Sequence, residues 1–421
     1  MSPHACDACL RKSALIGFLG ARLSAVLGGL DSRLGSVLAL GEAELIAAVA
    51  GRQAAEARRF SAGFDAEGSR RSLAETGVEA VCPHGGAYPV ALLTLADVPP
   101  VIYLTGGVDR LRELTQAPVA TVVGARTPSR YAIEVALDLG RGLAAAGVTV
   151  VSGLALGVDA AAHRGALAGG GGPLGVLAGG VDVPYPKTNR ALHSQIRDEG
   201  VLISELPPGL RPLRWSFPAR NRIMAALARL IVVVEAAESS GTLITAEFAV
   251  QLGREVGAVP GHVTARLAAG SNRLLREGAA VIRSPQDALD ELLGVGAGGR
   301  FDQTEAGRAA GPTRLETPPR RPTPVERGPS PLDALSASPR DEPSLEGSLR
   351  RVLDMVEGGE GVEAIGRETG LGPGRARAAL GRLELMGLVA RDGLASYVRT
   401  LGGPRVAPPI LDDPVPSEAH P

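Results

Sequence analysis

The chain has 421 residues, a length that favours two or three domains over one. Hydrophobic residues make up 45% of it and aromatic residues only 3%, so the core must consist mainly of Ala, Val and Leu, as is usual for parallel α/β sheets. The formal net charge of -1 excludes attraction of nucleic acid by the charge of the whole protein, and leaves that role to local basic patches.

No apolar run reaches the roughly 20 residues that span a bilayer. The first residues, MSPHACDACLRK, lack the basic-then-apolar order of a signal peptide. We therefore expect the protein to stay in the cytoplasm. In that reducing compartment the three cysteines, Cys6, Cys9 and Cys82, would be free thiols or metal ligands rather than disulfides.

Residues 1–75 are rich in Ala and Leu. Spacings such as Leu10, Ala14, Leu15 and Leu19 predict short amphipathic helices that glycines separate. This segment should form a small helical domain similar to SAM and helix-hairpin-helix domains.

Residues 76–295 form the predicted central domain, in which short β-branched runs alternate with helical segments. The runs are VATVVGA, GVTVVSG, PLGVLAGG, GVLISEL, RLIVVVEA, REVGAVPG and AAVIRS. Nearly continuous apolar strands linked by helices predict an α/β fold with a parallel sheet that is covered on both faces.

Residues 296–342 contain mainly Gly, Pro, Ser, Arg and Glu without periodic apolar positions, which predicts a disordered linker. Residues 343–402 then show three helical segments and a short hairpin, the order of a winged helix. Residues 403–421 are rich in Pro and are predicted to be a disordered tail.

Glycine, serine, threonine and arginine collect where the predicted strands end, at the edge where open α/β sheets bind ligands. After the first, second and fifth strands these residues are Gly124 and Arg126, Ser152 and Gly153, and Ser240, Gly241 and Thr242. Each loop precedes a helix, so its backbone N–H groups and the helix dipole favour an anion. The alternative is that the glycines only make tight turns.

The standard nucleotide fingerprints are missing. The first turn, GARTPS, is not G-x-G-x-x-G, and no G-x-x-x-x-G-K-[ST] occurs, so neither a dinucleotide site nor a P-loop is indicated. The same edge carries the cations Arg126, Lys187, Arg220 and Arg222. Separated cations suit a run of phosphates, so a polynucleotide backbone fits better than one small ligand.

Several segments, taken in order, resemble the DNA-processing protein A family, DprA, also called Smf. They are VVGARTPSRYA, VVSGLALGVDAAAHRGAL, GGVDVPYPKTN, FPARNRI, VVVEAAESSGTLITA and GSNRLLREGA, within a nearly continuous match over residues 80–290. The resemblance implies an extended Rossmann-type sheet that binds single-stranded DNA, protects incoming strands in natural transformation and recombination, and helps to load the RecA recombinase. It also implies a homodimer, and a binding protein rather than an enzyme.

Carried over position by position, the resemblance makes Arg126 the leading DNA contact. The DNA-binding residues that it implies are Gly124, Arg126, Ser152, Gly153, Lys187, Asn189, Arg220, Asn221, Arg222, Ser240, Gly241, Thr242 and Asn272. Three positions depart from the family pattern, and each loses a phosphate donor: Ala125, Leu156 and Ala268. Because the remaining contacts are independent of DNA sequence, we expect weaker binding at most and no change of function.

Some of these assignments have alternatives. Arg220 and Arg222 would otherwise belong to a solvated helix start or form an internal ion pair with Glu205 or Glu235. Lys187 would otherwise be an ordinary surface residue after a proline turn.

Two other functions stay open. The segment SSGTLITAE has a likeness to the P-G-G-x-G-T-x-x-E motif of phosphoribohydrolases, but Glu247 is displaced by two residues, which turns its side chain by about 200° on a helix. His163, which is tempting as a base, is better explained by helix packing or capping. A DNA-binding regulator would place a winged helix in a major groove, with the arginines Arg367, Arg375, Arg377 and Arg382.

Four residues predict a structural zinc site between the amino-terminal helices and the central domain: Cys6, Cys9, Cys82 and His84. Cys6-x-x-Cys9 has the spacing of a zinc knuckle, and Cys82-Pro-His84 offers two more ligands within one turn. The alternative is unrelated free thiols, because the C-x-H spacing is tighter than that of most ligand pairs. No other cofactor is expected.

Overall fold

The structure is a computed structural model of the chain. It describes residues 5–27 and 34–294 and, nearer the carboxyl end, residues 345–357, 362–370 and short stretches between 376 and 399. The predicted linker (296–342) and tail (403–421) lie outside the described residues. Within the described ranges, every helix is too short or too polar to cross a membrane.

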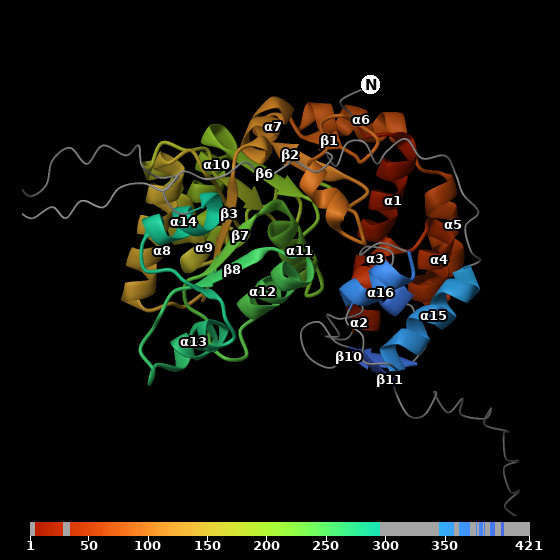
Figure 1. Ribbon diagram of the computed structural model, residues 1–421. Helices are drawn as coiled ribbons and strands as arrows, with labels where there is room; N and C mark the ends of the chain where they lie inside the picture. Colours follow the sequence, from red (N-terminus) through yellow and green to blue (C-terminus); the bar gives the residue numbers. More distant parts are fainter. Residues whose placement is uncertain are drawn as a thin grey trace, which may run out of the picture.

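A nine-stranded sheet occupies the centre of the protein (Figure 1). In the order in which they pair, its strands are β1 (Glu79–Val81), β2 (Ile102–Thr105), β6 (Val201–Ser204), β5 (Leu174–Val176), β4 (Thr149–Ser152), β3 (Val119–Val123), β7 (Leu230–Val233), β8 (Glu255–Ala258) and β9 (Ala280–Val281).

Neighbouring strands from β6 to β9 are parallel, so the predicted parallel α/β sheet is confirmed. The prediction missed β1 and β2, which add an antiparallel edge to β6. Both strands are short and lie ahead of the regular alternation of strand and helix. From β3 the chain builds outward through β4, β5 and β6 and then crosses to β7 on the other side of β3. The strand order therefore reverses between β3 and β7, and open α/β sheets usually bind ligands at the carboxyl ends of the strands at such a point.

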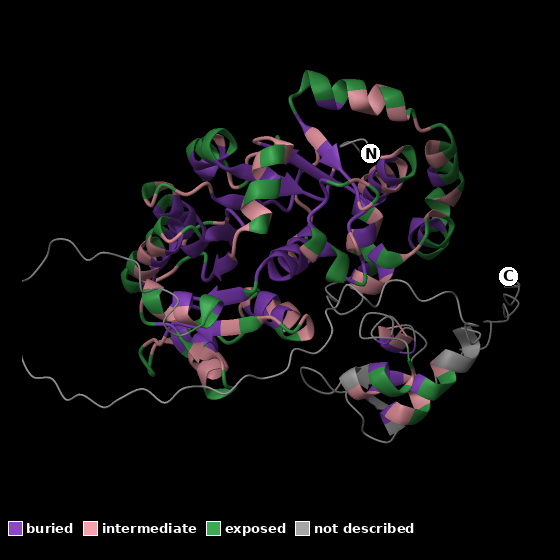
Figure 2. Ribbon diagram, turned by 45° about the horizontal axis from the view of Figure 1, so that its top comes forward, coloured by how far each residue is buried: buried purple, intermediate pink, exposed green. Residues whose placement is uncertain are grey.

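Helices cover both faces of the sheet. One face is covered by α8 (Arg130–Ala145), α9 (Val158–Ala168), α10 (Arg190–Glu199) and α14 (Pro285–Leu293). The other is covered by η4 (Val90–Thr94), α7 (Val108–Gln116), α11 (Ser216–Leu227), α12 (Thr242–Gln251) and α13 (Ala269–Arg276). In Figure 2 the strands between them are buried and the outer sides of the helices are exposed.

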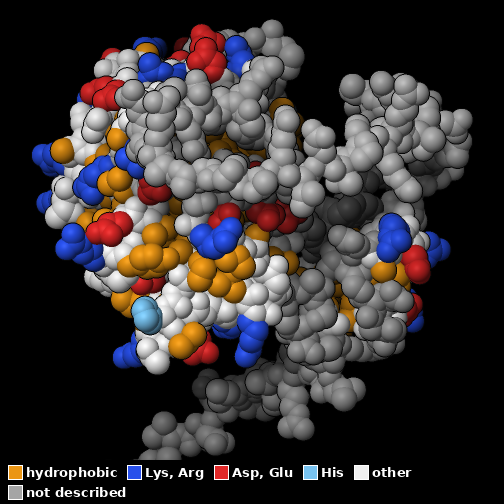
Figure 3. Space-filling view, turned by 60° about the vertical axis from the view of Figure 1, so that its left-hand side comes forward, with side chains coloured by type: hydrophobic (Ala, Val, Ile, Leu, Met, Phe, Trp, Pro, Cys, Tyr) orange, Lys and Arg blue, Asp and Glu red, His pale blue; other side chains and the backbone are white. Residues whose placement is uncertain are grey.

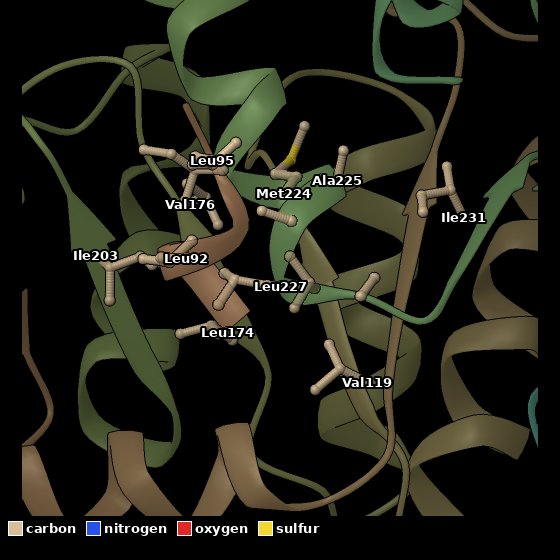
Figure 4. Packing of buried hydrophobic residues seen from close by; sticks show 14 of the residues in the cluster. Leu92, Leu95, Val119, Leu174, Val176, Ile203, Met224, Ala225, Leu227 and Ile231 are labelled. Atoms are coloured by element: carbon tan, nitrogen blue, oxygen red, sulfur yellow. The ribbon is translucent and has the colours of Figure 1, made fainter. Parts of the chain in front are cut away.

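Successive strand residues point to opposite faces and so serve two separate cores. Val123 belongs to the cluster under η4 and α11, and its neighbour Val122 to the cluster under α8 and α9. Figure 4 shows the first cluster, in which Leu92 and Leu227 pack against Leu174 of the sheet. In the second cluster small residues let helices approach closely. A Cβ on Gly140 of α8 would lie 2.2 Å from the carbonyl oxygen of Ala162 in α9.

The amino-terminal helices pack against the central domain. They are α1 (Asp7–Phe18), α2 (Gly20–Leu27), α3 (Leu34–Ala39), α4 (Glu42–Leu45), η2 (Ile46–Ala50), η3 (Gly51–Gln53), α5 (Ala54–Ala62) and α6 (Ala66–Glu75). Phe18 stacks on Phe60 with ring centroids 4.6 Å apart. Leu206 and Trp215 of the central domain complete this core, and the Trp215 indole N–H donates to the carbonyl of Gly20 (2.9 Å).

Near the carboxyl end, α15 (Leu345–Glu357) and α16 (Val362–Glu368) accompany an antiparallel pair, β10 (Val389–Arg391) and β11 (Tyr397–Arg399). Val352, Ile365 and Tyr397 contribute to one apolar cluster. Most of the predicted third helix, with Arg375, Arg377 and Arg382, lies outside the described residues. The winged helix therefore stays a prediction.

Candidate nucleic-acid interface

The loops that follow β3, β4 and β7 are hydrogen-bonded to one another. The Ala125 N–H donates to the carbonyl of Glu235 (2.7 Å), and the Val158 N–H donates to the carbonyl of Ala125 (3.2 Å). The Thr242 hydroxyl donates to the carbonyl of Gly124 (3.0 Å). Three segments that are far apart in the sequence thus form one platform at the point where the strand order reverses. Thr242, a predicted DNA contact, holds this platform together.

A pocket of about 70 Å³ opens beside the platform. It is lined by Arg126, Gly153, Ala155, Leu156, Leu177, Ala178, Gly179, Val183, Tyr185, Pro186, Pro212, Phe217 and Arg220. Arg126, Gly153 and Arg220 were predicted site residues, and the structure brings them together. The exposed Leu156 presents an apolar side chain where the family pattern has Arg.

Arg126 lies at the mouth of this pocket against an aromatic ring. Its guanidinium carbon is 5.1 Å from the centroid of the Phe217 ring, a cation–π contact. The Phe217 ring in turn lies 5.9 Å from that of Tyr185, which is 49% exposed. Arg126 is exposed and has no ion-pair partner among the described residues. Its donors are therefore available to an anion next to two aromatic surfaces.

Further cations are exposed close to the pocket in sequence. Lys187 begins the short helix η5 (Lys187–Asn189), directly after the pocket residue Pro186, and has no ion-pair partner within the described part of the chain. Arg211 and Arg214 are also exposed, on either side of the pocket residue Pro212 in the sequence, and the exposed Arg190 begins α10 shortly after Pro186. On the α8 and α14 side, in contrast, basic and acidic side chains are interspersed (Figure 3).

Asn189 fixes the loop after β4 instead of facing solvent. It is buried, and its amide donates to the carbonyls of Leu154 (3.0 Å) and Ala155 (3.2 Å). Leu154 has a φ of 54°, a left-handed conformation that is unfavourable for a branched residue. Asn189 thus stabilises a strained backbone turn on the wall of the pocket.

Two other predicted asparagines also hold backbone. The Asn221 amide donates to the carbonyl of Gly241 (3.3 Å). The Asn272 side chain accepts from the N–H of Gly261 and donates to its carbonyl, both at 3.1 Å. Gly241 itself is exposed, and Ser240 beside it is partly exposed, so this loop remains open to a ligand.

Ser152 and Gly153 do not offer the contacts that were predicted for them. The Ser152 side chain is completely buried and its hydroxyl donates to the carbonyl of Val122 (2.7 Å). Gly153 is needed because the guanidinium of Arg220 lies directly against it, and a Cβ there would be 1.2 Å from Arg220 Nη1. The prediction that Ser152 contacts DNA was wrong, because its side chain is buried and its hydroxyl already donates to the Val122 carbonyl.

Arg220 lines the same pocket although it is buried. It is 6% exposed, donates to the carbonyl of Val176 (3.2 Å) and lies 3.9 Å from a carboxylate oxygen of Asp159. That oxygen also accepts from the N–H groups of Gly153 (3.1 Å) and Ala155 (3.4 Å). Burial raises the pKa of Asp159, and the positive charge of Arg220 opposes this shift. Arg220 thus combines the predicted site position with the alternative of an internal ion pair, although its partner is Asp159.

The Glu235 carboxylate binds backbone at the start of α8, as the Asp159 carboxylate does in the loop after β4. Glu235 is buried, and its carboxylate accepts from both the N–H and the hydroxyl of Ser129 (2.8 Å each). The protein's own carboxylates, Glu235 and Asp159, therefore take N–H groups that we expected to bind phosphate after the first and second predicted strands. A phosphate at this edge depends on side chains more than on backbone N–H groups.

Arg222 is an internal residue, and its assignment as a DNA contact was wrong. Only 2% of it is exposed, and it donates to both carboxylate oxygens of Glu205 (3.0 and 2.8 Å) and to a carboxylate oxygen of Asp97 (2.5 Å). The alternative of an ion pair with Glu205 is what the structure contains. Asp97 is a second partner that the sequence did not suggest.

His163 packs inside the sheet–helix layer. It is completely buried in α9, and burial lowers its pKa to about 3. The imidazole is neutral near pH 7 and out of reach of any ligand, in agreement with the predicted packing role.

Glu247, the residue on which the phosphoribohydrolase alternative depends, lies away from the Arg126 pocket. It lines a different cavity, between α12 and β8, together with Arg254, Arg273 and Glu291. The geometry therefore gives no support to a catalytic carboxylate at the strand-end platform.

Comparison with known proteins identifies the family. The family model for DNA recombination-mediator protein A matches residues 79–293, about half of the chain. The chain belongs to this family. It is 36% identical over 323 residues to protein Smf of Synechocystis, covering 75% of this chain and 79% of the relative. It is 41% identical over 205 residues to DNA processing protein DprA of Streptococcus pneumoniae, covering 49% and 71%.

An X-ray structure of DNA processing protein A from S. pneumoniae has a similar fold. The TM-score is 0.54 at 32% sequence identity, and the alignment covers 68% of this chain and 96% of that chain. The resemblance to the DprA family that the strand-end motifs indicated is thus confirmed.

The aromatic side chains of this site belong to segments that resemble the family, but neither was predicted from the sequence to contact DNA. Tyr185 and Phe217 lie within the motifs PYPKTN and FPARNR, in which the cations beside them were the predicted phosphate contacts. With aromatic residues at only 3% of the chain, two rings next to strand-end arginines and a lysine were a usable signal.

Proposed function

We propose that this protein binds single-stranded DNA without sequence preference, protects incoming strands in natural transformation and recombination, and helps to load RecA on them. Membership of the recombination-mediator family supports the general role in DNA recombination. The protein acts in the cytoplasm by binding and catalyses no reaction at this site.

The observation that carries the proposal is Arg126 lying against Phe217 and beside Tyr185 at the mouth of the strand-end pocket. Proteins that bind single strands combine cations along the phosphates with aromatic rings on which unpaired bases stack. A duplex keeps its bases stacked on one another, so only a single strand would use both features. Because neither contact reads base edges, binding should be independent of sequence.

A salt-dependent titration of labelled oligodeoxythymidine tests the proposal. Arg126→Ala should weaken binding more than any other single change, by roughly 10- to 100-fold, the value of a hydrogen bond to a charged group. Lys187→Ala should follow. For each phosphate contact that is lost, the slope of log K against log salt should fall by roughly 0.7.

Arg141→Ala is the matched control. Arg141 is an exposed arginine in the last turns of α8, at the opposite edge of the sheet, where it pairs with Asp138. The charge change equals that of Arg126→Ala, so a general loss of positive charge would lower affinity equally in both variants. If Arg126→Ala and Lys187→Ala both bind like the wild type at moderate salt, the site assignment is wrong.

We further propose that the chain forms a homodimer through the central domain and that the dimer contacts RecA. The support is the membership of the recombination-mediator family together with the resemblance described above, which implies both a homodimer and RecA as a partner. Sedimentation velocity should show a dimer at micromolar concentration, and RecA should be retained on the immobilised protein. A monomer at high concentration that does not retain RecA would contradict this part of the proposal.

We propose that residues 343–402 form a winged helix that serves this function as an accessory and not as a regulator of transcription. Helices α15 and α16 share an apolar cluster with the β10–β11 pair, which suits that fold. A chain that ends at residue 294 should keep its affinity for single strands. Specific binding of a duplex by the full chain but not by this truncation would favour the regulator instead.

A further inference from the structure

A second cluster of reactive side chains lies outside the strand-end site. Cys6, Cys9, Cys82 and His84 come from two segments more than 70 residues apart, and their ligand atoms all lie within 4.8 Å of one another. None of them lines the Arg126 pocket. The three cysteines are all the cysteines of the chain, and all three are free.

The sulfur atoms converge on one ring nitrogen. His84 Nδ1 lies 3.4 Å from Cys6 Sγ, 3.3 Å from Cys9 Sγ and 3.9 Å from Cys82 Sγ. An imidazole nitrogen carries either one proton or one lone pair, so it can make only one good hydrogen bond with these thiols. Hydrogen bonding therefore does not account for the convergence of three sulfur atoms on the same point.

A tetrahedral metal ion does account for it. Zinc binds thiolate sulfur at about 2.3 Å and imidazole nitrogen at about 2.0–2.1 Å, which in a tetrahedron separates S from N by about 3.6 Å and S from S by about 3.8 Å. The three S–N distances, from 3.3 to 3.9 Å, bracket the first value. Small adjustments of side chains would bring all four atoms to a common centre.

Local structure determines how the ligands meet. Cys6 is the N-cap residue of α1 and Cys9 lies in its first turn, so both side chains stand on the same side of the helix start. Cys82 directly follows β1, and a turn closed by the Gly85 N–H and the Cys82 carbonyl (2.9 Å) puts His84 beside it. The Cys6 N–H also donates to Cys82 Sγ (3.4 Å), a contact that stabilises a thiolate.

The two segments are already joined by backbone. The Ala5 N–H donates to the carbonyl of Ala80 in β1 (2.8 Å), and Arg70 of α6 donates to the carbonyl of Ala5 (3.0 Å) and pairs with Asp7. Cys9 and Cys82 are buried in a small apolar cluster with Leu10 and Tyr103, whereas His84 is exposed. The site is thus preorganised by contacts that need no metal.

We propose that Cys6, Cys9, Cys82 and His84 bind one structural Zn²⁺ ion that fixes the start of α1 to the end of β1. Four protein ligands leave no open position for a substrate, which is typical of structural and not of catalytic zinc. A Cys₃His set of soft thiolates and one imidazole selects zinc over the hard cations Mg²⁺ and Ca²⁺. The ion anchors the amino-terminal helices to the sheet and stabilises their orientation.

Elemental analysis of tag-free, full-length protein tests the site. We expect about one zinc ion per chain, and Co²⁺ exchanged into it should give the intense visible bands of tetrahedral thiolate coordination. Because replacing the buried Cys9 risks misfolding, the main variant is His84→Ala, at an exposed position. It should lose zinc on dialysis against a mild chelator that leaves the wild type loaded. The control His262→Ala, at another exposed histidine, should retain zinc.

DNA binding separates this inference from the proposed function. His84→Ala should unfold at a lower temperature yet bind single strands like the wild type, because the metal does not contribute to the strand-end pocket. The inference is overturned if purified protein carries no zinc and its three thiols react freely with a thiol reagent. A Cys6–Cys9 disulfide in protein purified without reductant, or iron in place of zinc, would overturn it as well.

Discussion

Arg222 was predicted to contact DNA but is buried in the structure. A single substitution tests whether it stabilises the fold or binds DNA. Arg222→Met keeps most of the apolar stem and removes the guanidinium. In the wild type this group makes a bidentate bond to Glu205 and a further bond to Asp97, and it donates to the carbonyls of Ala219 (2.6 Å) and Asp97 (3.2 Å). The substitution leaves two carboxyl groups, 5% and 8% exposed, without their cation.

Breaking a buried ion pair by removing one partner costs about 3–5 kcal/mol, because the remaining charge stays desolvated. A domain of this size loses about 2–4 °C of Tm per kcal/mol, so we expect Tm to fall by roughly 6–20 °C. Burial raises the pKa of Asp97 and the Arg222 charge opposes it, so in the variant this pKa should rise further. The deficit in stability should therefore shrink as pH falls and Asp97 takes up a proton.

Circular dichroism melts give Tm, and fluorescence anisotropy at a temperature where the variant is folded gives the affinity for single strands. We expect a large loss of stability and unchanged affinity for Arg222→Met, and the reverse pattern for Arg126→Ala. Adding Asp97→Asn and Glu205→Gln to Arg222→Met should restore part of the stability, because no unpaired buried charge then remains. The reasoning is refuted if Arg222→Met melts like the wild type and binds DNA poorly.

Burial lowers the pKa of His163 from 6.5 to about 3. As pH falls between these two values, the unfolded chain binds one more proton than the native chain. The free energy of unfolding therefore drops by about 1.4 kcal/mol per pH unit. His163→Gln should lack this part of the slope in urea titrations between pH 6 and 5, and an unchanged slope would exclude the buried neutral imidazole. Gly153→Ala should lower the free energy of unfolding by about 1–3 kcal/mol, because its Cβ displaces the Arg220 guanidinium; wild-type urea curves would contradict this contact. Tyr185→Ala and Phe217→Ala should each weaken single-strand binding by about 1 kcal/mol, less than Arg126→Ala does, without changing the salt slope, and a changed slope would show that the rings do not act by stacking. ATP and NAD should give no binding heat in calorimetry at micromolar protein, because both phosphate fingerprints are absent; stoichiometric binding would count against a site specialised for a polymer.

The sequence by itself determined the parallel sheet and its functional edge. Seven β-branched runs separated by helical segments can bury their apolar faces in few ways other than a covered parallel sheet, and the carboxyl ends of parallel strands meet at one edge. Gly124, Arg126 and the Ser240–Thr242 loop could therefore be assigned to one edge of the sheet from the sequence alone. The cysteine spacing likewise brought Cys6, Cys9, Cys82 and His84 into one hypothesis, and the fold places their ligand atoms together.

Only the tertiary structure decided which polar residues face a ligand and which serve the fold. Arg220 and Arg222 lie two positions apart in α11, yet one reaches the pocket and the other pairs with acids in the interior. Such pairing depends on residues far apart in the sequence, such as Asp97 and Arg222, whose charges must be compensated once packing removes water from them. For the same reason Ser152 and Asn189, which read as phosphate donors in the sequence, donate instead to backbone carbonyls that burial would leave unsatisfied.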